Sequence, residues 1–206
     1  MKRNLTFLLI LISLSLNSQS LFNNYEEGKI TYRDGNEETG FIKISINDKI
    51  KFKKTKEDKK TILNYKKVKK VKFLNGDEYL YKITIKNKRI LLIKRRIVGK
   101  LELYSYTRSS PGLMTPNGMM MGGSTTTAYL IGKRDSDLIE HLPINPKKNK
   151  FRKIIMKYTS DCPKFLKLIK DKKSVKENFA KDYSGFFQNQ GTAVEDMINF
   201  YNGNCN

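Results

Sequence analysis

The chain has 206 residues and a formal net charge of +21, from 41 Lys or Arg against 20 Asp or Glu. This length suits one domain with a sizeable core. The surplus of cations favours anionic partners such as envelope phosphates, acidic glycans or nucleic acid, although abundant Lys, Asn and Ile are also typical of an AT-rich genome. One His and two Cys leave too few nitrogen and sulfur ligands for a metal site, and we expect no cofactor.

Residues 1–20 have the organisation of a secretory signal peptide. Lys2 and Arg3 form a positive start, an apolar run follows from Leu5 to Leu16, and the polar segment Asn17 to Ser20 ends it. The apolar run is too short for a membrane-spanning helix, which needs about 20 residues. We therefore expect an exported protein, periplasmic, outer-envelope-associated or extracellular, with no transmembrane segment after cleavage and one domain over residues 21–206.

Residues 27–140 show the alternation of apolar and polar residues that is typical of strands. In "DEYLYKITIK", Tyr79 and Tyr81 share one face with later isoleucines, and Lys82 lies on the other face. Turn signals occur at "DGN" (34–36) and "NGD" (75–77), where Asn and Gly accept positive φ. The pattern predicts a twisted antiparallel sheet or an open barrel-like body.

Residues 148–206 change to a helical period and predict a tail of three to four short helices. Phe151, Ile154, Ile155 and Tyr158 form one apolar stripe, and Pro163 is tolerated in the first turn of the next helix. Capping boxes are expected at 174–177 and 192–195. The prediction is a single α+β domain whose helices pack on the apolar face of the sheet.

The two cysteines, Cys162 and Cys205, predict one intramolecular disulfide, because disulfides persist outside the cytosol. Such a bridge would join the start of one helix to the end of the last. The alternative is a reactive Cys162 thiol with His141, the chain's single histidine, as its base.

Residues 109–132 hold four of the methionines and five of the glycines. The glycine spacing partly matches a phosphate-binding loop, but Ser124 stands where that motif needs Lys. Thioethers also suit Cu(I), yet no His or Cys is nearby to complete a site. We favour a loop between two strands whose methionines offer apolar surface to a partner: Met114, Met119, Met120 and Met121.

No catalytic set is visible in the sequence. The candidate carboxylate pairs fall in predicted turns: Asp34 with Glu37, Asp77 with Glu78, and Asp135 with Asp137. Tyr79 and Tyr81 read as core rather than as a base-stacking surface. We therefore expect a non-enzymatic, envelope-associated or extracellular interaction or structural domain. The alternatives are a binder of anionic envelope polymers or nucleic acid through its Lys-rich surface, and a hydrolase with unrecognised carboxylates.

Four segments together resemble a known family: "GKITYRDGNEETGFIKI", "GKLELYSYTR" before the Gly/Met-rich loop, "TTTAYLIGKRDS" after it, and the cysteine segments "SDCP" and "FYNGNC". The chain is similar to a family of uncharacterised secreted proteins of Bacteroidetes, in particular flavobacteria. The resemblance covers most of residues 21–206, and the family's two cysteine positions match Cys162 and Cys205. It implies an envelope or extracellular location, with the partner unknown, and it carries no activity to transfer.

Overall fold

The computed structural model describes residues 25–45, 48–110, 113–114, 120–121, 123–143, 149–179 and 190–205. Strands precede helices along the chain, and ten of the strands form one sheet. The predicted α+β class, with a barrel-like body and a helical tail, is confirmed. The predicted signal peptide, residues 1–20, lies outside the described residues.

The first five strands form a strongly curved half of the sheet, which we call the N-terminal lobe. The strands are β1 (Glu26–Tyr32), β2 (Glu37–Ile44), β3 (Ile50–Lys53), β4 (Thr61–Leu63) and β5 (Val68–Phe73). Their order in the sheet is β5-β1-β2-β3-β4, and every pair is antiparallel. Both predicted tight turns occur, with Gly35 at φ 92° and Gly76 at φ 91°. Local turn chemistry therefore sets the register of the β1–β2 hairpin and of the β5–β6 hairpin.

The next strands close into a five-stranded ring, which we call the barrel. They are β6 (Glu78–Thr84), β7 (Ile90–Ile97), β8 (Leu101–Ser110), β11 (Ser124–Lys133) and β12 (Leu138–Leu142). Closure comes from a parallel pair, in which Leu138 and Ile139 of β12 lie beside Ile83 and Thr84 of β6. The alternation along each strand predicts the sheet, but this long-range parallel pairing closes the barrel.

Four helices follow the barrel in the described residues: α2 (Asn149–Tyr158), α3 (Pro163–Lys170), α4 (Lys172–Phe179) and α5 (Gln190–Asn204). The expected stripe of α2 is buried. The two expected capping boxes are wrong. Main-chain N–H groups of Lys173 and Ser174 donate to the Asp171 carboxylate, so α4 begins before Ser174. Helix α5 begins at Gln190, which places Thr192 inside it.

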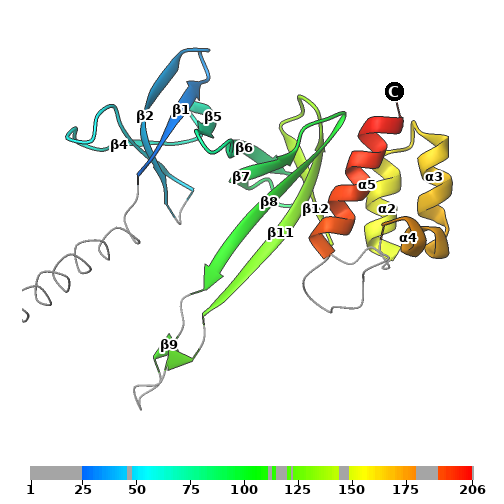
Figure 1. Cartoon of the computed structure of the whole chain (residues 1–206). Coiled ribbons are helices and arrows are strands. Elements are labelled where there is room, and N and C mark those ends of the chain that lie inside the picture. The colour runs from blue at the N-terminus through cyan, green and yellow to red at the C-terminus, as the bar shows by residue number, and fades with distance from the viewer. Residues whose placement is uncertain are drawn as a thin grey trace, which may run out of the picture.

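The barrel lies between the N-terminal lobe and the helices (Figure 1). The outer faces of β8, β11 and β12 contribute Leu103, Ile131 and Leu142 to a core shared with the helices. Tyr81 and Leu92, on β6 and β7, instead face the core of the lobe. Each apolar side chain that is fully buried in this way contributes roughly 1.5–3 kcal/mol. The barrel is therefore a rigid central support with a packed neighbour on either side.

The Gly/Met-rich segment forms the tip of the β8–β11 hairpin. Two short strands, β9 (Leu113–Met114) and β10 (Met120–Met121), pair antiparallel there, with Met114 opposite Met120. Met119 lies outside the described residues. A partner contact through Met114, Met119, Met120 and Met121 stays a prediction.

Candidate functional site

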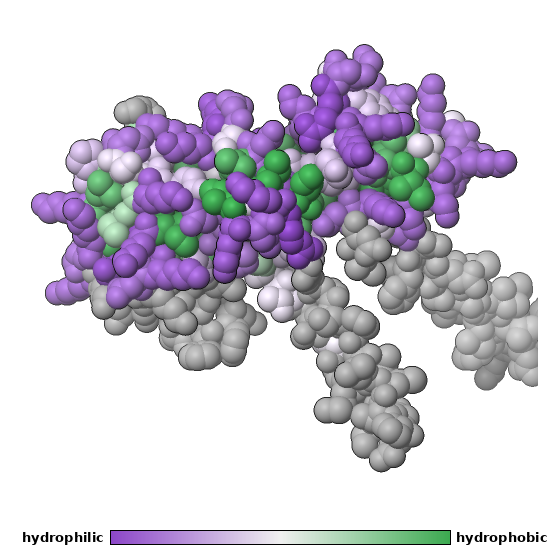
Figure 2. Space-filling view, turned by 180° about the vertical axis from the view of Figure 1, so that it is seen from behind, coloured by the Kyte–Doolittle hydropathy of each residue, from purple (hydrophilic) through white to green (hydrophobic). Residues whose placement is uncertain are grey.

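Charge by itself does not single out a site on this protein. Figure 2 shows hydrophilic side chains over most of one face of the molecule, with hydrophobic residues in small separate groups. A binding site must therefore be recognised from shape and from the pairing of charges. Two places stand out on these grounds: a groove on the N-terminal lobe and a charged cluster inside the barrel.

The first place is an open groove of about 840 Å³ on the N-terminal lobe, which we call the lysine groove. It is formed by β1 and β2, by the end of β5 and by the loop after β3. Its lining includes Lys29, Lys54, Lys72, Thr39, Phe41 and Leu74.

Two paired glycines shape the groove. Gly28 of β1 lies opposite Gly40 of β2 and also opposite Phe73 of β5. A Cβ on Gly28 would lie 2.7 Å from the carbonyl oxygen of Lys72, and one on Gly40 would lie 2.4 Å from that of Lys53. Only glycine permits this close approach of backbones. The strands can therefore approach closely and curve tightly here.

The strand register gathers cations on the opposite face of the same strands. Lys29 is the direct cross-strand partner of both Lys72 and Thr39, so the three residues share one face of the sheet. The Lys29 ammonium lies 2.7 Å from Glu37, and this hydrogen bond is the main reason that the pKa of Glu37 is lowered. Lys54 and Lys72 are exposed and have no ion pair or hydrogen bond of their side chains within the described ranges. Two ammonium groups of the groove are therefore uncompensated.

A smaller hollow of about 420 Å³ continues the lysine groove on its apolar side. Glu27, Phe41 and Leu74 line both hollows, and Tyr25 lines the smaller one. The Lys56 ammonium lies 5.4 Å from the centre of the Phe41 ring, within the range of a cation–π contact. Leu74 is 78% exposed, more than any other large hydrophobic residue of the described chain. The unpaired lysines therefore belong to the larger hollow, and Phe41 and Leu74 extend apolar surface from it into the smaller one.

The second place is inside the barrel, where a group of side chains forms what we call the barrel cluster: Glu78, Lys82, Arg95, Glu102 and Tyr104. Arg95 bridges the two carboxylates, with Nη1 3.0 Å from Glu102 and Nη2 in contact with Glu78. The Tyr104 hydroxyl donates to Glu102. Lys82 donates to the carbonyl oxygen of Ser136 at 2.6 Å.

Burial dominates the electrostatics of the barrel cluster. Lys82 is 5% exposed and Glu102 is 3% exposed. Burial lowers the pKa of the Lys82 ammonium, and the nearby Glu102 carboxylate opposes that effect. Burial and the hydrogen bond to Glu102 raise the pKa of the Tyr104 hydroxyl. Within the cluster two carboxylates face two cations, and Glu78 also pairs with the more exposed Lys70 at 3.3 Å. The buried charges are therefore compensated locally.

The barrel cluster corrects one expectation from the sequence. Glu78 does not lie in a turn; it is the first residue of β6, and its side chain is bridged to Arg95. Asp77 does lie in the turn, where its carboxylate pairs with Lys94 at 2.6 Å. The fold thus brings together Glu78 and Glu102, which are far apart in the sequence, but it places a guanidinium between them. This arrangement favours a structural role for both carboxylates.

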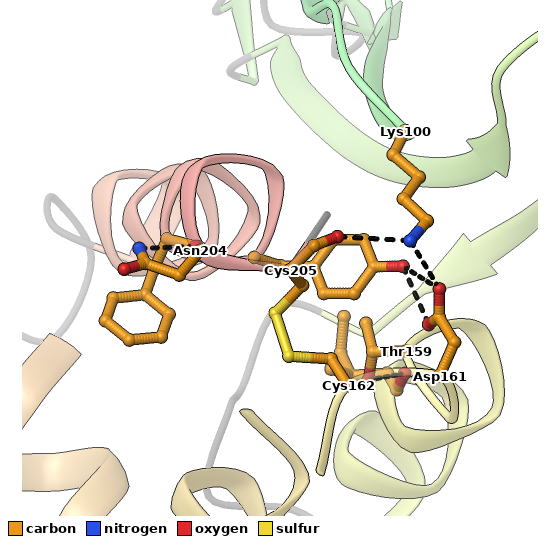
Figure 3. Close-up of a disulfide and its surroundings, with 9 residues drawn as sticks. Lys100, Thr159, Asp161, Cys162, Asn204 and Cys205 are labelled. Atoms are coloured by element: carbon orange, nitrogen blue, oxygen red, sulfur yellow. Dashed lines mark hydrogen bonds and ion pairs between the residues drawn. A yellow bond between two sulfur atoms is a disulfide. The ribbon is translucent and has the colours of Figure 1, made fainter. Parts of the chain in front are cut away.

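The predicted disulfide between Cys162 and Cys205 is confirmed, with the two Cα atoms 5.5 Å apart. The alternative of a reactive Cys162 thiol is therefore wrong. Lys100, in the turn between β7 and β8, reaches both cysteine segments (Figure 3). Its ammonium lies 2.7 Å from Asp161 and donates to the carbonyl oxygen of Cys205 at 3.1 Å.

Further hydrogen bonds fasten the end of the tail to the barrel. The Tyr201 hydroxyl donates to Asp161 at 2.8 Å, and donation from Lys100 and Tyr201 lowers the pKa of Asp161. The Asn202 side chain accepts from the N–H of Leu101 and donates to its carbonyl oxygen, both at 2.9 Å. The disulfide and these bonds together hold α5 against the start of β8.

The residues expected to be core are confirmed as core. Tyr81 is buried, and Tyr79 packs against the same cluster, so neither offers an open ring for a base. His141 is exposed on β12. Sequence reasoning missed the lysine groove, although an isolated glycine within an alternating strand, as at Gly28 and Gly40, signals close backbone approach.

Comparisons with protein-family models, with curated proteins and with solved structures each found no match. The resemblance to secreted Bacteroidetes proteins stays a prediction. Within the described chain, no helix combines the length and apolar character needed to cross a membrane. Among the same residues, no three His, Cys, Asp or Glu side chains are grouped to hold a metal ion. The functional argument therefore depends on the geometry of the lysine groove.

Proposed function

We propose that this protein is a non-enzymatic, exported interaction domain that binds an anionic polymer of the cell envelope in the lysine groove. The observation that carries the proposal is the pair of uncompensated ammonium groups, Lys54 and Lys72, at a concave surface. Other exposed lysines, such as Lys167 and Lys170 on α3, also lack a partner in the described structure, but they line neither hollow. Cations held unpaired at a concave surface favour an anionic ligand.

The rest of the fold has a supporting role in this proposal. The barrel fixes β5 through its pairing with β6, and β5 in turn pairs with β1 beside the groove. The helical tail, closed by its disulfide, packs on the other side of the barrel. Rigid strands position a site more accurately than loops do, and they limit the ordering cost of binding.

Salt-gradient elution from immobilised heparin tests the proposal on the chain from Leu21 onward. We expect Lys54→Gln with Lys72→Gln to elute at clearly lower salt than the wild type. The matched control is Lys167→Gln with Lys170→Gln on α3, which removes the same charge from two exposed lysines outside the groove. Equal shifts for both variants would show diffuse attraction without a site, because a diffuse attraction depends on the number of cations and not on their place on the surface.

A further inference from the structure

The lysine groove and its neighbouring hollow form one trough with three chemically different parts. The ammonium groups of Lys54 and Lys72 belong to the larger hollow alone, whereas the apolar side chains of Phe41 and Leu74 extend along both hollows. Glu27 lines both hollows and therefore lies at their junction. Its carboxylate is exposed and has no hydrogen bond or ion pair among the residues that the structure describes.

An unpaired carboxylate beside two unpaired ammonium groups selects among anionic ligands. A carboxylate repels a second anionic group of the ligand and accepts hydrogen bonds from hydroxyl donors. A ligand that suits the trough has an acidic group for the lysines, hydroxyl donors for Glu27 and an apolar face for Phe41 and Leu74. Acidic sugars have all three, because their ring C–H groups form an apolar face and their rims carry hydroxyls.

Nucleic acid fits the trough less well. The DNA backbone carries phosphates but no free sugar hydroxyls between its ends, so it would repel Glu27 without donating a hydrogen bond to it. Single-strand binding also uses several open aromatic rings on which bases stack, whereas Phe73 of the groove is buried. Lysine, unlike arginine, offers no bidentate fork for phosphate.

We propose, on the basis of the proposed function, that the ligand of the trough is an acidic polysaccharide. Its acid group lies between Lys54 and Lys72, its hydroxyls donate to Glu27, and a sugar ring packs on Phe41 and Leu74. The acidic residue Glu27 is thus a specificity residue: it strengthens binding of the glycan and weakens binding of ligands that carry only phosphate.

Calorimetric titration of the wild type and three variants with two probes tests this proposal. The probes are a short oligogalacturonate and a short oligothymidylate at the same ionic strength. For Glu27→Ala we expect affinity for oligogalacturonate to fall about tenfold, the value of one hydrogen bond to a charged group, and affinity for oligothymidylate to rise. The matched control is Glu57→Ala, an exposed carboxylate in the loop after β3 that lines neither hollow.

The outcomes distinguish failure of the polysaccharide inference from failure of the proposed anion-binding function. The double variant Lys54→Gln, Lys72→Gln should lower the affinity for both probes, as the proposed function requires. If Glu27→Ala raised the affinity for both probes, the polysaccharide inference would be overturned, whereas the proposal of anion binding in the groove would stand. If the double lysine variant bound oligogalacturonate as the wild type does, both proposals would fail. Equal effects of Glu27→Ala and Glu57→Ala would show that net charge, and not the junction of the trough, sets the affinity.

Discussion

The barrel cluster and the lysine groove use the same kinds of side chain in opposite ways. Inside the barrel, Arg95 is bridged to Glu78 and Glu102, and the buried Lys82 donates to a main-chain oxygen. In the groove, the exposed Lys54 and Lys72 are left without partners in the described structure. A buried charge is costly unless it is paired, whereas an exposed one remains hydrated. The comparison teaches that pairing marks structural charges, and that its absence at a concave surface marks charges available to a ligand.

The largest expected effect comes from breaking the barrel cluster. Glu102→Gln removes one carboxylate charge and leaves Arg95 undercompensated in the barrel, so we expect the free energy of unfolding to fall by about 3–5 kcal/mol. Urea unfolding followed by circular dichroism measures the change. The control is Glu37→Gln at the exposed pair with Lys29, which should leave the midpoint nearly unchanged. Similar midpoints for both variants would contradict the contrast between buried and exposed charges.

Removing the disulfide should have the next largest effect on stability. Cys162 and Cys205 are 43 positions apart, and the loop-entropy model gives about 4 kcal/mol for a loop of that size. We expect Cys162→Ser with Cys205→Ser to lower the urea midpoint accordingly. Affinity for oligogalacturonate at low temperature should be unchanged, because the tail and the groove lie on different sides of the barrel. A variant that stays folded but loses binding would show that the tail takes part in the site.

Alkaline unfolding should report the buried tyrosines. Burial raises the pKa of Tyr81 to about 12, and burial together with Glu102 raises that of Tyr104. The unfolded chain then loses these protons more readily, so stability falls as the pH rises from about 10 to about 12. Lys82 acts in the opposite direction, since its lowered pKa makes the folded state more stable as the pH rises toward the ordinary value of 10.5.

Tyrosinate absorbance and circular dichroism, followed together through the alkaline range, check this prediction. The absorbance of the buried tyrosines should rise with the loss of structure. Tyr81→Phe should reduce the pH dependence, because it removes a group whose pKa differs between the folded and unfolded states. A full tyrosinate signal near pH 10 in protein that is still folded would contradict the burial of Tyr81 and Tyr104.

The smallest expected effect on stability comes from adding a methyl group where the backbones approach beside the groove. Gly40→Ala places that methyl against the carbonyl oxygen of Lys53, so we expect a loss of about 1–3 kcal/mol together with weaker ligand binding. The control is Gly203→Ala in α5, where a Cβ meets nothing within 4 Å. That substitution should stabilise the helix by about 0.5–1 kcal/mol and leave binding unchanged. Thermal unfolding distinguishes the expected loss of stability in Gly40→Ala from the expected gain in Gly203→Ala.

Much of the fold follows from local patterns in the sequence. The alternation of apolar and polar residues predicts that Tyr79 and Tyr81 belong to a core. The turn glycines predict two hairpins, and the 3.6-residue period predicts the buried stripe of α2. The same alternation put Lys82 on the other face of β6, but it does not reveal that this face is the barrel interior. That depends on β12 pairing with β6, a contact between segments far apart in the chain.

The candidate site was less accessible to prediction for the same reason. Lys54 and Lys72 belong to two lysine-rich runs, "KFKKTKEDKK" and "KKVKKVK", which look alike in the sequence. Only the pairing of β5 with β1 brings Lys72 beside Lys29, and only the pairing of β1 with β2 places Gly28 opposite Gly40. The three parts of the trough come from segments that meet through tertiary structure, so composition and local period carry little information about them.

The most direct test of the central claim is a nuclear magnetic resonance titration of isotope-labelled protein with oligogalacturonate at moderate salt. The account predicts that amide shifts concentrate at residues 27–29, 39–41, 54 and 72–74, and that they are absent in the Lys54→Gln, Lys72→Gln variant. Shifts centred on the lysines of α2 and α3, with the groove unperturbed, would contradict it.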